Sequence, residues 1–104
     1  MLDSGFGWGK RVIKSFKDKQ AETIDQGNVS RKLPQNMQRN ARKKLRQLGA
    51  AHALDDLRIP PGNRLEALKG DREGQHSIRI NDQWRLCFRF ENGHAYEVEI
   101  VDYH

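Results

Sequence analysis

Three alternating runs decide the fold, and all of them lie within residues 76–102, HSIRINDQWRLCFRFENGHAYEVEIVD. Apolar and polar residues alternate in His76–Ile80, in Trp84–Phe90 and in Tyr96–Ile100. An alternation with a period of two is typical of β-strands that bury one face. Each run is therefore predicted to form a strand with one apolar side.

Short turn sequences separate these runs. Asn81-Asp82-Gln83 follows the first run, and Asn92-Gly93, a strong tight-turn signal, follows the second. Connections this short join neighbouring strands in antiparallel order, so we expect a meander in which alternate side chains share a face. The predicted core side carries Ile78, Ile80, Trp84, Leu86, Phe88, Phe90, Tyr96, Val98 and Ile100, and the opposite side carries Arg79, Arg85, Cys87, Arg89 and Tyr103.

The residues before the meander have the patterns of one short strand and two helices. Arg11–Phe16 is a short β-like run, and Asp18–Gln26 has helical composition that ends at Gly27-Asn28. A longer helix is predicted from Pro34 to Leu48, with Gly49 at its end. Its apolar residues recur at helical spacing and form a predicted buried stripe of Met37, Ala41, Leu45 and Leu48.

Helices followed by antiparallel strands indicate an α+β fold, in which a short N-terminal strand and two helices pack on the sheet. The length of 104 residues fits a single domain. Residues 1–10 contain three glycines and follow neither a helix nor a strand pattern. We therefore expect a flexible extension over residues 1–10 and one domain over residues 11–104.

The charge of the chain favours a polyanionic partner. There are 19 Lys and Arg against 14 Asp and Glu, a net charge of +5, and nucleic acid is the first candidate. The longer helix carries four cations off its apolar stripe, Arg39, Arg42, Lys43 and Arg46. Such a face is either solvated or a binding surface, and the pattern alone leaves both open.

The sequence shows no sign of a metal site, a nucleotide cofactor or a membrane segment. Its one cysteine, Cys87, excludes an internal disulfide and a cysteine metal cluster, which fits a cytoplasmic protein. None of the four histidines forms an H-x-x-x-H pair, and glycine-rich phosphate loops and G-x-S-x-G are missing. No apolar run approaches the roughly 18 residues of a membrane span. We expect neither metal nor cofactor, no membrane contact, and a cytoplasmic location.

Groups that can cut RNA without a metal gather toward the C-terminus, namely Lys69, Arg85, Asp102, Tyr103 and His104. Cleavage through the 2′-OH needs a base for its proton, a cation for the phosphate and an acid for the 5′-oxygen. The planar fork of Arg85 suits a phosphate, and His104 titrates near neutral pH. A lone arginine on a strand is more often a solvated surface residue. Taken alone, these residues indicate a basic nucleic-acid-binding domain and leave catalysis open.

Three motifs carry a resemblance to a known family. Residues 65–90 read L-x-x-L-K-G-D-R-E-G-x-x-S-I-R-I-N-x-x-W-R-L-x-F-R-F, residues 102–104 read D-Y-H, and residues 12–16 read V-I-K-S-F. In this order and at these distances, they resemble the HigB-type toxins of the RelE/ParE superfamily.

The resemblance implies a microbial-RNase fold and the toxin of a type II toxin-antitoxin system. It implies a ribosome-dependent, metal-independent endoribonuclease that cleaves mRNA. It also implies neutralisation by a HigA-like helix-turn-helix antitoxin, and contact with operator DNA only through the complex with that antitoxin.

The resemblance also implies which residues act. The family's ending matches at Asp102, Tyr103 and His104, and its basic residues match at Lys69 and Arg85. Some members have an active-site histidine where this chain has Glu66, which departs from the family's pattern. A carboxylate can act as a base there, but it repels phosphate. The expected RNA-binding residues are Lys69, Arg72, Arg79, Arg85 and Arg89.

Two alternatives remain open at this point. The first is a toxin of the ParE branch, which would have the same fold but would poison DNA gyrase without nuclease activity. The second is a nucleic-acid-binding module with no activity. A shared fold cannot separate them, because function resides in the site, but the D-Y-H ending favours the RNase branch.

Overall fold

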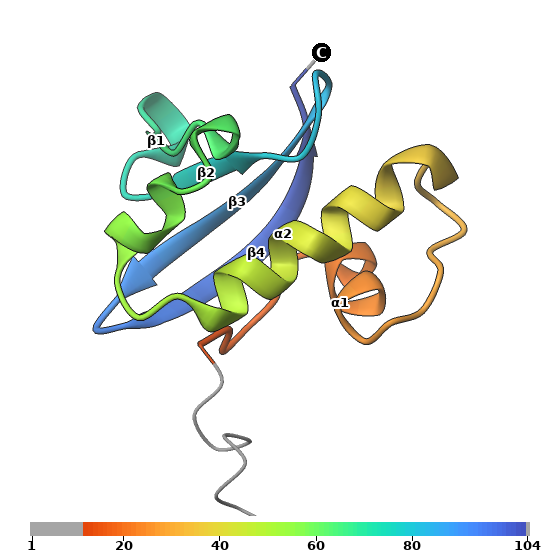
Figure 1. Ribbon diagram of the computed structural model, residues 1–104, viewed down its shortest axis with the longest axis horizontal. Helices are drawn as coiled ribbons and strands as arrows, with labels where there is room; N and C mark the ends of the chain where they lie inside the picture. The colour runs from red at the N-terminus through yellow and green to blue at the C-terminus, as the bar shows by residue number, and fades with distance from the viewer. Residues whose placement is uncertain (1–11, 104) are drawn as a thin grey trace, which may run out of the picture.

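A computed structural model describes residues 12–103 of the chain, so the predicted extension Met1–Lys10 and the terminal His104 lie outside it. An antiparallel sheet forms its centre (Figure 1). The strands follow one another in the order β1 (Glu66–Ala67), β2 (His76–Arg79), β3 (Trp84–Glu91) and β4 (His94–Asp102). The predicted meander is confirmed, and the two-residue strand β1 extends it at one edge.

Both predicted hairpins form, each for a local reason. The side-chain oxygen Oδ1 of Asn81 accepts hydrogen bonds from the backbone N–H groups of Gln83 and Trp84, each at 2.9 Å, and closes the first turn. In the second, Asn92 and Gly93 have φ angles of 53° and 79°. Two consecutive positive φ values give the turn whose twist matches that of the flanking strands.

Two helices cover one face of the sheet, as predicted, and α2 crosses that face in Figure 1. Helix α1 (Lys19–Asp25) begins where Oδ1 of Asp18 accepts from the N–H of Gln20 at 2.8 Å. A short 3₁₀ turn after Pro34 leads into α2 (Gln38–Ala50). The helix ends at Ala50, so the predicted end at Leu48 is wrong by two residues. The stripe of Met37, Ala41, Leu45 and Leu48 is at most 1% exposed and confirms the predicted buried face.

The N-terminal run lies beside β4 in parallel orientation. It does not form a continuous strand, because only Ile13 and Phe16 make β-bridges, to Ala95 and Val98 respectively. The backbone of residues 12–17 exchanges hydrogen bonds of 2.7–3.1 Å with β4, so this run protects the edge of the sheet.

A β-bulge in β4 reverses the predicted side of one tyrosine. The pairing shifts between Cys87 and Arg89, and Glu97 adopts a left-handed φ of 55°. The extra residue puts Tyr96 opposite Arg89, on the outer face, whereas Ala95 enters the core with 0% exposure. The prediction that Tyr96 belongs to the core is therefore wrong, whereas the predictions for Val98 and Ile100 are confirmed.

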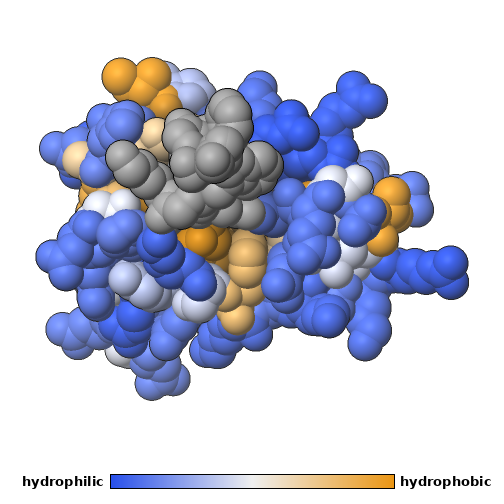
Figure 2. All heavy atoms as spheres, turned by 90° about the horizontal axis from the view of Figure 1, so that it is seen from below, coloured by the Kyte–Doolittle hydropathy of each residue, from blue (hydrophilic) through white to orange (hydrophobic). Residues whose placement is uncertain are grey.

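The surface of the domain is mainly polar. Figure 2 shows hydrophilic residues over most of the face seen from below, with hydrophobic residues confined to small areas. Within residues 12–103, no helix has the length and apolar character needed to cross a membrane.

Candidate active site

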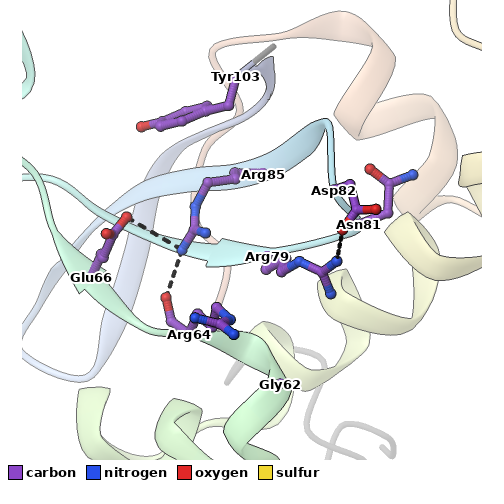
Figure 3. Close-up of a pocket in the computed structure, with 8 residues that line it drawn as sticks. All are labelled: Gly62, Arg64, Glu66, Arg79, Asn81, Asp82, Arg85 and Tyr103. Atoms are coloured by element: carbon purple, nitrogen blue, oxygen red, sulfur yellow. Dashed lines mark hydrogen bonds and ion pairs between the residues drawn. The ribbon is translucent and has the colours of Figure 1, made fainter.

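A groove lies on the face of the sheet opposite the helices, at the end where β4 finishes. We call it the Arg85 groove; its volume is about 640 Å³, and Figure 3 shows its lining. It is lined by Gly62, Arg64, Glu66, Arg79, Asn81, Asp82, Arg85 and Tyr103. The sheet therefore brings together four residues named from the sequence, Glu66, Arg79, Arg85 and Tyr103.

Arg85 is held on several sides and its side chain is only 12% exposed. Its Nε donates to Oγ of Ser77 at 2.7 Å, and its Nη2 donates to the carbonyl oxygen of Arg64 at 2.6 Å. The Glu66 carboxylate lies 3.6 Å from Nη2, and the Tyr103 ring centre lies 5.8 Å from the guanidinium carbon. These contacts fix the guanidinium plane in advance of any ligand.

The groove carries three arginines against two carboxylates, Glu66 and Asp82. Arg79 lies directly opposite Arg85 in the pairing of β2 with β3, and Arg64 lines the same space. Like charges that face each other across a sheet are unfavourable, and an anion between them relieves the repulsion. Arg79 is paired with Asp82, whose side chain is 97% exposed. Together the three guanidinium groups form a site suited to a phosphate.

Tyr103 supplies the groove with a phenol that stays protonated. Its N–H donates to the carbonyl of Gln83 at 2.7 Å, which fixes the backbone just after β4. Burial, and after it the nearby Cys87 thiol, raises the pKa of the Tyr103 phenol. Its oxygen lies 3.9 Å from Sγ of Cys87, whose own pKa is raised by burial. At neutral pH, Tyr103 can therefore donate a hydrogen bond or a proton.

The structure does not place all the predicted catalytic residues in the groove. Asp102 pairs with Trp84 in the sheet, which puts it on the helix side, and there it accepts a hydrogen bond from Nε2 of Gln83 at 3.1 Å. Lys69 is exposed and precedes the 3₁₀ turn at Gly70–Arg72, away from the groove lining. His104 lies outside the described residues. The roles of these residues stay predictions.

Two of the predicted RNA-binding arginines are engaged elsewhere. Arg72 forms a 2.8 Å ion pair with Glu99, and this hydrogen bond raises the pKa of the guanidinium. Arg89 forms a 3.2 Å ion pair with Glu97, the residue of the bulge. Neither arginine lines the Arg85 groove. Their side chains connect loops and strands on the outer face.

Sequence reasoning missed Arg64 as a groove residue and took Asn81 and Asp82 only for turn residues. The run Pro60-Pro61-Gly62 before Arg64 is typical of a turn, and nothing in it indicates that the backbone of Arg64 lies against Arg85. Asn81 and Asp82 line the groove because the hairpin that they form ends beside it. The sequence did offer one signal for Asn81 and Asp82: their turn lies between two strand arginines, Arg79 and Arg85.

Metal ligands do not cluster in the part of the chain that the structure describes, where no three His, Cys, Asp or Glu side chains are placed to hold an ion. His76 is half-buried, and burial lowers the pKa of its imidazole. Its Nδ1 is buried without a partner among residues 12–103.

A second groove lies on the exposed side of α2. It is lined mainly by the four cations seen in the sequence, together with Gln47 and Ala50. Helix α2 contains no Asp or Glu, and Arg39, Lys43 and Arg46 are exposed. Cations three and four positions apart repel one another along a helix, so the arrangement lowers helix stability and favours an anionic partner.

The fold of this chain matches that of a solved bacterial protein. The crystal structure of YafQ from E. coli strain BL21(DE3) superimposes with a TM-score of 0.56 at 13% identity, over 90% of this chain and 94% of that one. At this identity the match shows the fold, an α+β domain with helices on an antiparallel sheet.

The family is shown by the sequence as a whole. A family model described as RelE-like toxin of type II toxin-antitoxin system HigB matches residues 14–104, so the chain belongs to the HigB-like toxins. A toxin of a type II system has an antitoxin partner.

Named relatives agree with this family. Toxin HigB-1 of Vibrio cholerae is 44% identical over 81 residues, which are 77% of this chain and 85% of the relative. Endoribonuclease HigB of Proteus vulgaris is 34% identical over 93 residues, which are 89% of this chain and all of the relative.

Proposed function

We propose that this HigB-like toxin is an endoribonuclease that cleaves mRNA on the ribosome without a metal, and that Arg85 holds the scissile phosphate. The family and the Proteus vulgaris relative, named as an endoribonuclease, support the activity. The observation that carries the site is the preorganised Arg85 guanidinium. Ser77 and Arg64 hold it at 2.7 and 2.6 Å, and no hydrogen bond within residues 12–103 reaches its Nη1.

The proposed reaction is a transesterification within the RNA, in which the phosphorus exchanges its bond to the 5′-oxygen for a bond to the 2′-oxygen. The 2′-oxygen attacks the adjacent phosphorus while Glu66, a groove carboxylate with 58% side-chain exposure, takes the 2′ proton. The bond from phosphorus to the 5′-oxygen breaks, and Tyr103 gives that oxygen a proton. The products are a 2′,3′-cyclic phosphate and a 5′-hydroxyl. Arg85 and Arg79 offset the charge that builds up on the phosphate.

The remaining partners are proposed from the family. A HigA-like helix-turn-helix antitoxin would neutralise the toxin, operator DNA would be bound only through that complex, and the pair would act in the cytoplasm. The cationic face of α2 supports docking on the ribosome, because it offers phosphate contacts outside the Arg85 groove.

Labelled mRNA incubated with translating ribosomes and the purified toxin tests this function. We expect cuts at defined codon positions that leave cyclic phosphate ends and that stop when the antitoxin is added. DNA breaks that require gyrase, with intact mRNA, would instead identify a toxin of the ParE kind. If the toxin produces neither mRNA cuts nor DNA breaks, it is only a nucleic-acid-binding module.

Replacing Glu66 tests its role as the base. Because Glu66→Gln keeps the size of the side chain but cannot accept the 2′ proton, we expect a fall in the cleavage rate of about 10²-fold. Asp55→Asn removes an exposed carboxylate outside the groove and serves as the control. The rate is measured in single turnovers on ribosomes. A faster Glu66→Gln enzyme would show that the carboxylate only repels phosphate.

Charge reversal on α2 tests ribosome docking. We expect Lys43→Glu combined with Arg46→Glu to weaken ribosome binding at least about tenfold, equivalent to about 1.4 kcal/mol, because both cations are exposed on the second groove. The control, Lys14→Glu with Lys19→Glu, makes the same change in net charge elsewhere. Equal losses in both proteins, measured by ribosome co-sedimentation, would assign the effect to net charge alone.

A further inference from the structure

The loop before β1 is anchored to α2 through one buried asparagine. Asn63 is 0% exposed. Its Nδ2 donates to Oε1 of Gln47 and to the carbonyl of Leu57, each at 3.1 Å. Its Oδ1 accepts from Nζ of Lys44 at 2.5 Å. Since Gln47 and Lys44 belong to α2, the helix fixes the backbone at the point where Arg64 follows.

Arg64 has a backbone conformation that favours a different residue. Its φ of 48° and ψ of 57° are left-handed, a region that glycine and asparagine tolerate and that the Cβ of other residues disfavours. In this conformation the Arg64 carbonyl accepts the 2.6 Å hydrogen bond from Nη2 of Arg85. A glycine at position 64 would present the same backbone carbonyl to Arg85. The hydrogen bond therefore does not explain why this residue is an arginine.

The side chain of Arg64 lies on the groove wall without an acid partner. Arg79 is paired with Asp82, and Arg85 lies 3.6 Å from Glu66. Within residues 12–103, no ion pair or hydrogen bond engages the Arg64 guanidinium, and the residue is exposed. Figure 3 shows its carbonyl directed at Arg85 while its side chain remains on the groove wall.

We propose that Arg64 is an RNA-contacting residue that binds the backbone phosphate next to the one held by Arg85. One residue thus has two tasks: its carbonyl positions the Arg85 guanidinium, and its own guanidinium positions the strand. This inference deepens the proposed function and rests on it. A second phosphate contact beside the reacting one aligns the 2′-oxygen with the departing 5′-oxygen.

Arg64→Gly separates the two tasks, because glycine keeps the left-handed backbone and removes only the guanidinium. The probe is a single-stranded, 2′-O-methylated RNA oligonucleotide, which binds but cannot be cut. Loss of one phosphate contact should reduce the slope of log affinity against log salt by about 0.7. Arg64→Asn, which also tolerates this conformation, should behave like the glycine variant, and Arg64→Lys should keep the wild-type slope.

Cleavage on ribosomes completes the test. For Arg64→Gly we expect KM for the mRNA–ribosome substrate to rise several-fold and kcat to change less, because Arg85 stays in place. Wild-type salt slopes in both the glycine and the asparagine variants would overturn the inference. The wild-type and Arg85→Ala proteins separate this failure from failure of the proposed function. Intact mRNA after incubation with the wild-type toxin would reject the function, and wild-type cleavage by Arg85→Ala would reject the role of Arg85. An active wild type, an inactive Arg85→Ala protein and unchanged Arg64 variants would reject only the role of Arg64.

Discussion

Replacing Arg85 with alanine is expected to lower the rate of mRNA cleavage by about 10²–10³-fold or more, because the scissile phosphate loses its preorganised cation. Arg85→Lys should restore only part of the rate. Lysine keeps the charge, but it cannot hold Ser77, the Arg64 carbonyl and a phosphate with one planar group. Single-turnover cleavage on programmed ribosomes measures both effects.

The same replacement should reduce stability more than its outer-face position suggests. A solvated surface residue would cost about 0.5 kcal/mol. Arg85 is instead mostly buried, and its loss leaves the buried Ser77 hydroxyl without its donor, at a cost of about 1–3 kcal/mol. Denaturant unfolding measures this cost. Arg58→Ala, an exposed arginine outside the groove, is the control for both assays. A folded Arg85→Ala toxin with the wild-type cleavage rate would contradict the phosphate-binding role.

Replacing Tyr103 with phenylalanine is the second change with a large expected effect, a loss of about 10²-fold in cleavage. The substitution keeps the ring near Arg85 and removes the hydroxyl that protonates the departing 5′-oxygen. Tyr96→Phe is the matched control, because Tyr96 lies on the same face but pairs with Arg89, away from the groove. Equal rates for Tyr103→Phe and Tyr96→Phe would remove Tyr103 from the mechanism.

The pKa of Tyr103 fixes the sign of its pH dependence. Burial and the Cys87 thiol raise the pKa of the phenol above its ordinary value of 10.0, so the protonated form persists throughout the neutral range. Activity that depends on this proton is present below the raised pKa and is lost only when the pH rises through it. Between about pH 7 and 9 we therefore expect no fall in rate from ionisation of Tyr103. If the cleavage rate does fall in this pH range, and the fall is absent in Tyr103→Phe, the pKa of the Tyr103 phenol is lower in the complex with the ribosome and mRNA.

Much of the fold could be predicted from local patterns. Alternation at Trp84–Phe90 and the Asn92-Gly93 turn produced the meander, because side-chain period and turn chemistry are properties of neighbouring residues. The buried stripe of α2 followed from helical spacing in the same way. The HigB resemblance named Arg85 and Tyr103, which the sheet brings to one groove.

The sequence by itself therefore determined the strands β2, β3 and β4, the two helices, the charge and the family. Only the tertiary structure decided which of the named residues meet. The bulge at Glu97 moves Tyr96 out of the core, and the sheet pairing puts Asp102 opposite Trp84 on the helix side. The Arg64 carbonyl reaches Arg85 across 21 residues of chain. The physical reason is that strand register and backbone-to-side-chain hydrogen bonds join segments far apart in sequence, and a one-residue bulge turns the side chains on one side of it to the opposite face.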